Sequence, residues 1–309
     1  MAKITARPRR TPTNRNRARV TVRAYDSEVA AMTETVLITG ANSGIGLETT
    51  RALAARGYRT LMLCRSAERV NAACDEIRTT VPDANLQVIH ADLGLQSSIR
   101  HAAAEIMDTT HRLDVLVNNA GIQTRTMERT AEDHDVMLAT NQLGPFLLTE
   151  LLRPLLTASA PARVVTVASN AHRFAKTVDI DHLDTPTSYG FLGFRRYGET
   201  KMMNILWTAE LARRLDGSGV TANSLHPGGV RSNLGNPTPW QRAMASAFLV
   251  PAEKGALTSV FLATDPSVAG VSGGYWAKSK RADDKRSAAA SDDALAARLW
   301  TACEDLTRE

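Results

Sequence analysis

Residues 35–46 read Thr35-Val36-Leu37-Ile38-Thr39-Gly40-Ala41-Asn42-Ser43-Gly44-Ile45-Gly46, and this segment predicts the fold of the chain around it. Its first half is apolar and β-branched, as in a buried strand, and its second half is a glycine-rich loop that leads into a helix. Glycine lets a backbone turn tightly and approach a ligand, and the free N–H groups at a helix start favour an anion. The segment therefore predicts a phosphate-binding turn.

The chain that follows repeats the order of strand and helix. Short, nearly continuous apolar runs predict strands covered on both faces at Thr35–Thr39, Thr60–Cys64, Leu86–His90, Val115–Val117, Val164–Val167 and Val220–Leu225. Helices are predicted near 45–56, 67–79, 97–110, 131–156 and 197–214. Strict alternation gives βαβ units and a parallel sheet. We expect one α/β domain, a doubly wound Rossmann sheet with helices on both faces.

The charge of the chain is concentrated at its start. Of a net charge of +5 over 309 residues, residues 1–31 carry +6, which leaves the remainder near −1. A nearly neutral body has no broad electrostatic reason to bind nucleic acid, so no such partner is expected. We expect residues 1–32 to be a disordered basic tail and residues 33–309 to form the domain.

The role of the basic tail stays open between several hypotheses. It is a solvated tail, an organelle-targeting peptide, a nucleic-acid contact, or the product of a start site placed upstream of Met32. No apolar run reaches the ~18 residues of a membrane span, so none is expected. Cys64, Cys74 and Cys303 are scattered, which indicates reduced thiols, a cytoplasmic location and no metal site.

The glycine-rich loop predicts a dinucleotide site at the mouth of the first βα turn. Its expected cofactor-binding residues are Gly40, Asn42, Ser43, Gly44, Ile45 and Gly46. After the second strand, Arg65 stands where an NAD site usually has an acidic residue, and a guanidinium pairs well with a 2′-phosphate. NADP(H) is therefore expected rather than NAD(H), with nearby Arg69 more simply explained as a solvated surface residue.

Further cofactor contacts are expected at the ends of later strands. Asp92 and Leu93 follow the third strand, where Asp92 either contacts the adenine or caps the next helix. The remaining expected contacts are Asn119, Ala120, Gly121, Pro227, Gly228, Val230 and Ser232. An alternative for the asparagine amide after the fourth strand is that it ties neighbouring strands together.

Tyr197 and Lys201 are the predicted centre of the chemistry. Hydride transfer to a carbonyl builds negative charge on oxygen, so the site needs a proton donor. Tyr197 and Lys201 are four residues apart and face the same way on a helix, so the ammonium is expected to lower the phenol pKa. Both are also expected to contact the cofactor. Tyr189, the rival tyrosine, has Gly193 at the corresponding position.

Two more polar residues complete the expected site. Ser169, at the end of the fifth strand, either steadies the substrate oxygen or caps the turn that follows. Asn141 precedes a Gly-Pro break in a helical stretch, where it is expected to bind a relay water, unless Pro145 only kinks the helix. His226 has no acidic neighbour in sequence and is interpreted as a packing residue.

Taken together, these motifs resemble the short-chain dehydrogenase/reductase family. Its retinol dehydrogenase-like and WW-domain oxidoreductase-like members are the most similar, on the residues Cys64-Arg65, Ala171-His172-Arg173, Glu210–Leu215, His226-Pro227-Gly228 and Leu299-Trp300. The resemblance implies a sheet of about seven strands and a catalytic tetrad of Asn141, Ser169, Tyr197 and Lys201. Dimers or tetramers are common in the family, so a homo-oligomer is compatible with it. Gly198-Glu199-Thr200 departs from the usual small or serine residue before the lysine, which places local packing in question.

The resemblance and the residues imply an NADP(H)-dependent oxidoreductase that acts reversibly on a carbonyl or alcohol. Substrate-binding insertions are expected near 174–196 and 233–253, where Phe191, Phe194, Trp240 and Phe248 favour a lipophilic small molecule. The alternative is an NADP-binding sensor or scaffold without turnover. An intact acid beside the hydride site argues against that alternative.

Overall fold

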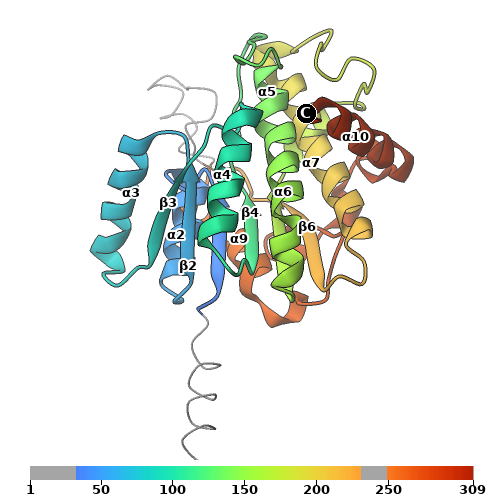
Figure 1. Ribbon diagram of the computed structural model, residues 1–309. Coiled ribbons are helices and arrows are strands. Elements are labelled where there is room, and N and C mark those ends of the chain that lie inside the picture. The colour runs from blue at the N-terminus through green and yellow to red at the C-terminus, as the bar shows by residue number, and fades with distance from the viewer. Residues whose placement is uncertain (1–32, 231–248, 309) are drawn as a thin grey trace, which may run out of the picture. The chain divides into compact units, whose positions relative to one another are not determined.

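A computed structural model describes residues 33–230 and 249–308, and its centre is one twisted sheet (Figure 1). Within these residues the strand order is β3-β2-β1-β4-β5-β6-β7-β8, parallel except for the last pair. The strands are β1 Thr35–Thr39, β2 Arg59–Cys64, β3 Leu86–His90, β4 Val115–Asn118, β5 Ala162–Val167, β6 Val220–His226, β7 Tyr275–Ala277 and β8 Lys280–Arg281. The doubly wound sheet is confirmed, and all six strands predicted from apolar runs are present.

The additional strands, β7 and β8, form a short hairpin at one edge. Lys278 and Ser279 connect them, with φ values of 52° and 55°. Positive φ at both central residues is the conformation of a type I′ turn, whose twist matches that of antiparallel strands. The expected count of about seven strands therefore becomes eight, because the chain folds back once more after β7.

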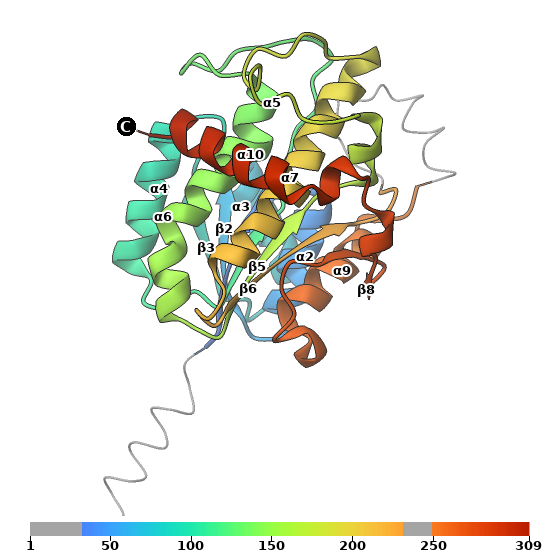
Figure 2. The same ribbon diagram turned by 90° about the vertical axis from the view of Figure 1, so that its right-hand side faces the viewer.

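Alternate residues of the central strand face opposite layers of helices. Val36 and Ile38 belong to one buried cluster and Leu37 to another, and all three are fully buried. This double burial explains why the run lacks a polar face. One layer contains α2 Gly44–Ala54, α3 Ala67–Thr80 and α9 Ala252–Thr264, and the other α4 Gln96–Thr109, α6 Gly144–Ala158 and α7 Phe194–Arg214. Figure 2 shows α2 and α9 on the side of the sheet opposite α4 and α6.

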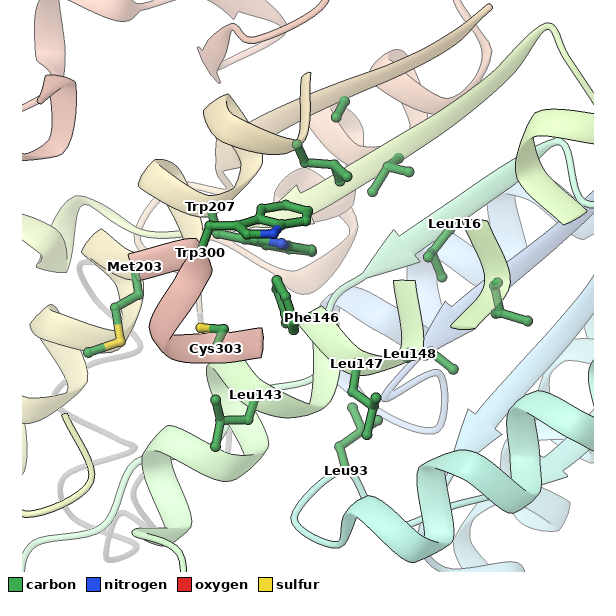
Figure 3. Packing of buried hydrophobic residues seen from close by; sticks show 14 of the residues in the cluster. Leu93, Leu116, Leu143, Phe146, Leu147, Leu148, Met203, Trp207, Trp300 and Cys303 are labelled. Atoms are coloured by element: carbon green, nitrogen blue, oxygen red, sulfur yellow. The ribbon is translucent and has the colours of Figure 1, made fainter. Parts of the chain in front are cut away.

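A last helix, α10 (Asp293–Leu306), packs outside α6 and α7. Trp300 of α10 lies edge-on to Phe146 of α6, with ring centroids 4.9 Å apart, and Trp207 of α7 lies 6.3 Å from the same ring (Figure 3). Aromatic pairs of this geometry add to the free energy of burial.

Among the helices of the described residues, none is both long and apolar enough to cross a membrane.

The single helix predicted over 131–156 is wrong. The chain forms α5 (Val136–Leu138), then the π-helical turn η1 (Ala139–Leu143), then α6. Such π turns widen the helix locally and often occur at functional sites. Tertiary contact explains the interruption: at Gly144 an added Cβ would lie only 2.4 Å from the Leu93 carbonyl oxygen, so the backbones meet closely there.

Candidate active site

The strand order reverses between β1 and β4, and the two loops that leave these strands lie side by side. Thr39 Oγ1 accepts hydrogen bonds from the N–H groups of Asn119 and Ala120, both at 3.0 Å. Asn119 Nδ2 donates to the Thr39 carbonyl at 2.8 Å. The Asn119 amide thus ties two strands together, as one interpretation of the sequence held. In open α/β sheets, ligands bind at such a reversal.

The glycine-rich loop has the shape that a pyrophosphate requires. Gly40 has φ of +65°, and an added Cβ on Gly46 would lie 2.2 Å from the Gly40 carbonyl oxygen, so only glycine fits both positions. Ser43 precedes α2 without a side-chain capping bond, and an added Cβ on Gly44 would meet nothing within 4 Å. The helix start is therefore open toward an anion, flanked by the half-exposed side chains of Asn42 and Ile45. The loop fits a dinucleotide.

Arg65 and Asp92 meet at the ends of β2 and β3. Their Nη1 and Oδ2 atoms are 3.5 Å apart, and the Arg65 side chain is 73% exposed. Asp92 does not cap α4, because its Oδ1 accepts from the Gly94 N–H at 2.9 Å. Glu132 binds the first N–H groups of α4 instead, at 2.6 Å and 3.1 Å. Asp92 stabilises the turn that contains buried Leu93.

Ser169, Tyr197 and Lys201 converge at the end of β5. The Ser169 hydroxyl lies near enough to the Tyr197 phenol to act on it by lowering the phenol pKa. Its Oγ also accepts from the Ala171 N–H at 3.1 Å and so caps the short helix η2 (Asn170–Phe174), which leaves the hydroxyl proton for the phenol oxygen. Lys201 Nζ lies 5.7 Å from the centroid of the Tyr197 ring. The interpretation of Ser169 as a cap is therefore confirmed, and its contact with the substrate oxygen stays a prediction.

The predicted net lowering of the Tyr197 pKa is not found, because burial acts more strongly in the opposite direction. Burial raises the pKa of Tyr197 to about 12, and the Ser169 hydroxyl lowers it by less. The ammonium instead donates to the Val167 carbonyl at 2.9 Å and to Asn204 Oδ1 at 3.1 Å. Burial lowers the pKa of Lys201 to about 8. The expectation was wrong because it took the charge of Lys201 into account but not the burial of both groups.

Asn141 uses its side chain to hold the loop after β4. Its Oδ1 accepts from the Ile122 N–H at 2.8 Å, and its Nδ2 donates to the Ile122 carbonyl at 2.9 Å and to Thr200 Oγ1 at 3.0 Å. The Asn141 carbonyl accepts from Asn204 Nδ2 at 2.7 Å. The sequence did not single out Asn204, whose only signal is its place three residues after Lys201.

The unusual residues between Tyr197 and Lys201 have packing roles. An added Cβ on Gly198 would lie 2.5 Å from the Ala171 carbonyl oxygen, so glycine allows α7 to approach η2. Thr200 bonds to Asn141 as described, and Glu199 pairs with the buried Arg196 at 3.2 Å. The contacts of these three residues therefore explain why the sequence departs from the family pattern here.

The segment after β6 agrees in part with expectation. His226 Nδ1 accepts from the Asn170 N–H at 3.2 Å, and burial lowers the pKa of His226 to about 4, as for a neutral packing residue. Gly228 has φ of +95° beside Pro227, and Val230 forms a parallel bridge with Val250. Ser232 and most of the expected insertion at 233–253, including Trp240 and Phe248, lie outside the described residues.

The insertion at 174–196 exposes several apolar side chains just before Tyr197. Phe174, Phe191 and Phe194 are 65%, 83% and 42% exposed, and Leu192 is 37% exposed. We call these four residues the apolar rim. An added Cβ on Gly193 would lie 1.8 Å from the Thr124 carbonyl oxygen, so the rim sits against the segment that follows Gly121.

Within the described residues, no group of His, Cys, Asp or Glu side chains could hold a metal ion.

The chain is similar to known proteins over most of its length. A family model described as short chain dehydrogenase matches residues 34–179. Retinol dehydrogenase 14 from Mus musculus is 38% identical over 288 residues, which cover 88% of this chain and 85% of the relative. The chain belongs to the short-chain dehydrogenase family.

Other members of the short-chain dehydrogenase family are similarly close. Dehydrogenase/reductase SDR family member 13 from Bos taurus is 39% identical, over 88% of this chain and 72% of that protein. A crystal structure of an uncharacterized protein from Mycobacterium Paratuberculosis has a TM-score of 0.72 and 33% identity, covering 89% of this chain and 93% of that one. The resemblance to retinol dehydrogenase-like members is thereby confirmed. As a short-chain dehydrogenase, the chain is an oxidoreductase for alcohols or carbonyls with a nicotinamide cofactor.

Proposed function

We propose that this short-chain dehydrogenase uses NADP(H) to interconvert a lipophilic carbonyl compound and its alcohol, with Tyr197 as general acid and base. The observation that carries the proposal is the meeting of Ser169, Tyr197 and Lys201 at the carboxyl end of the sheet, where the glycine-rich loop also lies. The bound nicotinamide would supply or accept the hydride.

The residues of the site match the charge that develops during reduction. As hydride reaches the carbonyl carbon, the carbonyl oxygen becomes negative and needs a proton. With its pKa near 12, the Tyr197 phenol holds its proton at neutral pH and has one to give. Ser169 offers a second donor, and the buried Lys201 ammonium stabilises the phenolate that results. Oxidation of the alcohol reverses these steps.

The preference for NADP(H) is supported by Arg65. Its guanidinium is largely exposed and paired loosely with Asp92, so it is free to turn toward a 2′-phosphate. No acidic side chain occupies that position at the end of β2. A ribose with a free 2′-hydroxyl would gain less from a guanidinium, since the contact is then not charge-assisted.

A lipophilic substrate is supported by the apolar rim. Exposed aromatic groups lose contact with water when an apolar molecule covers them, which favours binding. The relatives named retinol dehydrogenases are named for a largely apolar alcohol. A molecule bound at the rim would lie near Tyr197, since Phe194 precedes Tyr197 by less than one helical turn.

The test is reduction of a panel of aldehydes, ketones and quinones with NADPH by the parent and by Tyr197→Phe. Loss of the acid should reduce kcat about 10²- to 10⁴-fold while NADPH binding is retained. Tyr58→Phe is the control. Tyr58 directly precedes β2, at the end of the strand opposite the site, so this variant should keep full activity. A parent that binds NADPH without turnover of any compound would favour the sensor alternative.

A further inference from the structure

Asn204 is a buried amide that joins the site's lysine to the π-helical turn. It is 2% exposed and lies on α7, three residues after Lys201. Its Oδ1 accepts from Lys201 Nζ at 3.1 Å, and its Nδ2 donates to the Asn141 carbonyl at 2.7 Å and to Gln142 Oε1 at 3.2 Å. A regular helix over 131–156 would not present the carbonyl of Asn141 in this way, because the π turn shifts the ladder of hydrogen bonds.

The orientation of the Asn204 amide is fixed by its neighbours. An ammonium only donates hydrogen bonds, so the oxygen must face Lys201. A backbone carbonyl only accepts them, so the nitrogen must face Asn141. A flipped amide would set donor against donor and acceptor against acceptor in a buried place, which is costly. Asn204 can therefore hold the lysine in one position only.

The surroundings of Lys201 leave few other groups to hold it. From β5 it meets the Val167 carbonyl, and from its own helix it meets Asn204. Tyr197 is the titratable side chain that faces it, with 5.7 Å between Nζ and the ring centroid. From the loop after β4, an added Cβ on Gly121 would lie 3.4 Å from Nζ. Two of the three ammonium protons are thus assigned, and one is left for the phenol or the cofactor ribose.

We propose that Asn204 is a positioning residue that aims the Lys201 ammonium at Tyr197 and couples it to the turn that carries Asn141. The inference rests on the proposed function, because it gives Lys201 its role. Asn204 itself does not touch the reacting atoms. Its oxygen favours the charged amine, and its nitrogen fixes where that amine stands.

Two substitutions by side chains similar in size to asparagine should shift the pKa of Lys201 in opposite directions. Asn204→Leu removes the acceptor, which should lower the pKa of Lys201 by about one pH unit or more from its value near 8. Asn204→Asp keeps an acceptor and adds a negative charge, which should raise the same pKa by about one unit or more. The fall in Asn204→Leu is the decisive result, because replacing a residue that only filled space by an apolar side chain of similar size would leave the Lys201 pKa unchanged.

The measurement is an NMR pH titration of protein labelled with ¹³C at the lysine Cε, with the Lys201 signal assigned by its loss in Lys201→Arg. Thr208→Val is the matched control, because Thr208 is buried on the same helix and bonds to the Asn204 carbonyl, but does not touch Lys201. It should leave the Lys201 pKa unchanged. The pH profile of kcat should move in the same direction as the Lys201 pKa in each Asn204 variant.

Opposite shifts in the two variants support the inference, and equal or absent shifts overturn it. If Asn204→Leu does not fold, Asn204→Ala takes its place, because it also removes the acceptor of the Lys201 ammonium. The titration needs no turnover. A parent without activity would therefore overturn the proposed function while the placement of Lys201 by Asn204 is still judged from its pKa.

Discussion

Arg65 on the loop after β2 and Asp92 after β3 form an ion pair with 3.5 Å between Nη1 and Oδ2. The pair lies at the carboxyl edge of the sheet, on the side of β1 away from β4. Its exposure means that it contributes little to folding, since surface pairs are typically worth less than 1 kcal/mol. Arg65 is therefore available for recognition of a ligand.

Cofactor choice should change when Arg65 is replaced. Arg65→Ala removes a charge-assisted contact to the 2′-phosphate, so the Kd for NADPH should rise about 10- to 100-fold while that for NADH changes little. Titration of cofactor fluorescence gives both values. Arg69→Ala, one helical turn on, is the matched control and should leave both within a factor of about 3. Equal weakening of the two cofactors by Arg65→Ala would contradict the proposed NADP(H) preference.

Gly46 should tolerate no side chain. The Cβ of Gly46→Ala would lie 2.2 Å from the Gly40 carbonyl oxygen, and backbone on both sides cannot yield easily. We expect the free energy of unfolding to fall by about 1–3 kcal/mol. The clash outweighs the ~1 kcal/mol by which alanine is favoured over glycine within a helix. Urea denaturation measures it. Gly270→Ala, where an added Cβ meets nothing within 4 Å, should change stability by less than about 1 kcal/mol.

The buried Arg196 should be essential for stability. It is 1% exposed and binds Asp135 Oδ1 through Nε and Nη2, both at 3.1 Å. Arg196→Met leaves the Asp135 carboxylate buried without its counter-charge, which should cost about 3–5 kcal/mol. Urea unfolding followed by circular dichroism measures the loss. Adding Asp135→Asn should recover part of it, whereas Arg78→Ala, which breaks an exposed pair with Asp75, should cost less than about 1 kcal/mol.

His226 should make the fold less stable in mild acid. Burial lowers its folded pKa to about 4, below the ordinary 6.5, so between these values the unfolded chain binds one more proton. Stability is therefore present above about pH 6.5 and falls as the pH drops toward 4. His226→Asn keeps an acceptor for the Asn170 N–H and does not titrate. Its stability relative to the parent should improve by about 2 kcal/mol between pH 7 and pH 4.5, and a constant difference would refute this account.

The main elements of the fold were predictable because their signals are local. The runs around Val36 and Leu37 are apolar on both faces, and the glycine-rich loop combines a turn and a helix start in one segment. The short strand β7 and the helix α10 were not recognised. Three residues are too few to show a period, and the aromatic contacts of Trp300 come from distant helices.

The sequence predicted which residues come together better than it predicted how they are arranged. The spacing of Tyr197 and Lys201 indicated one helical face, which the structure shows. The raised pKa of Tyr197 depends on burial by other elements, and the π turn at Asn141 depends on contacts with Ile122 and Leu93. Asn204 was missed for the same reason, because its three partners come together only through folding.

The hairpin formed by β7 and β8 limits the addition of further strands at this edge of the sheet. Its outer strand, β8, has only the two residues Lys280 and Arg281, both exposed, so it offers little backbone and repels like charge. Short, charged outermost strands discourage the stacking of one molecule's sheet onto another's. Aggregation by strand addition is therefore disfavoured at this margin of the sheet.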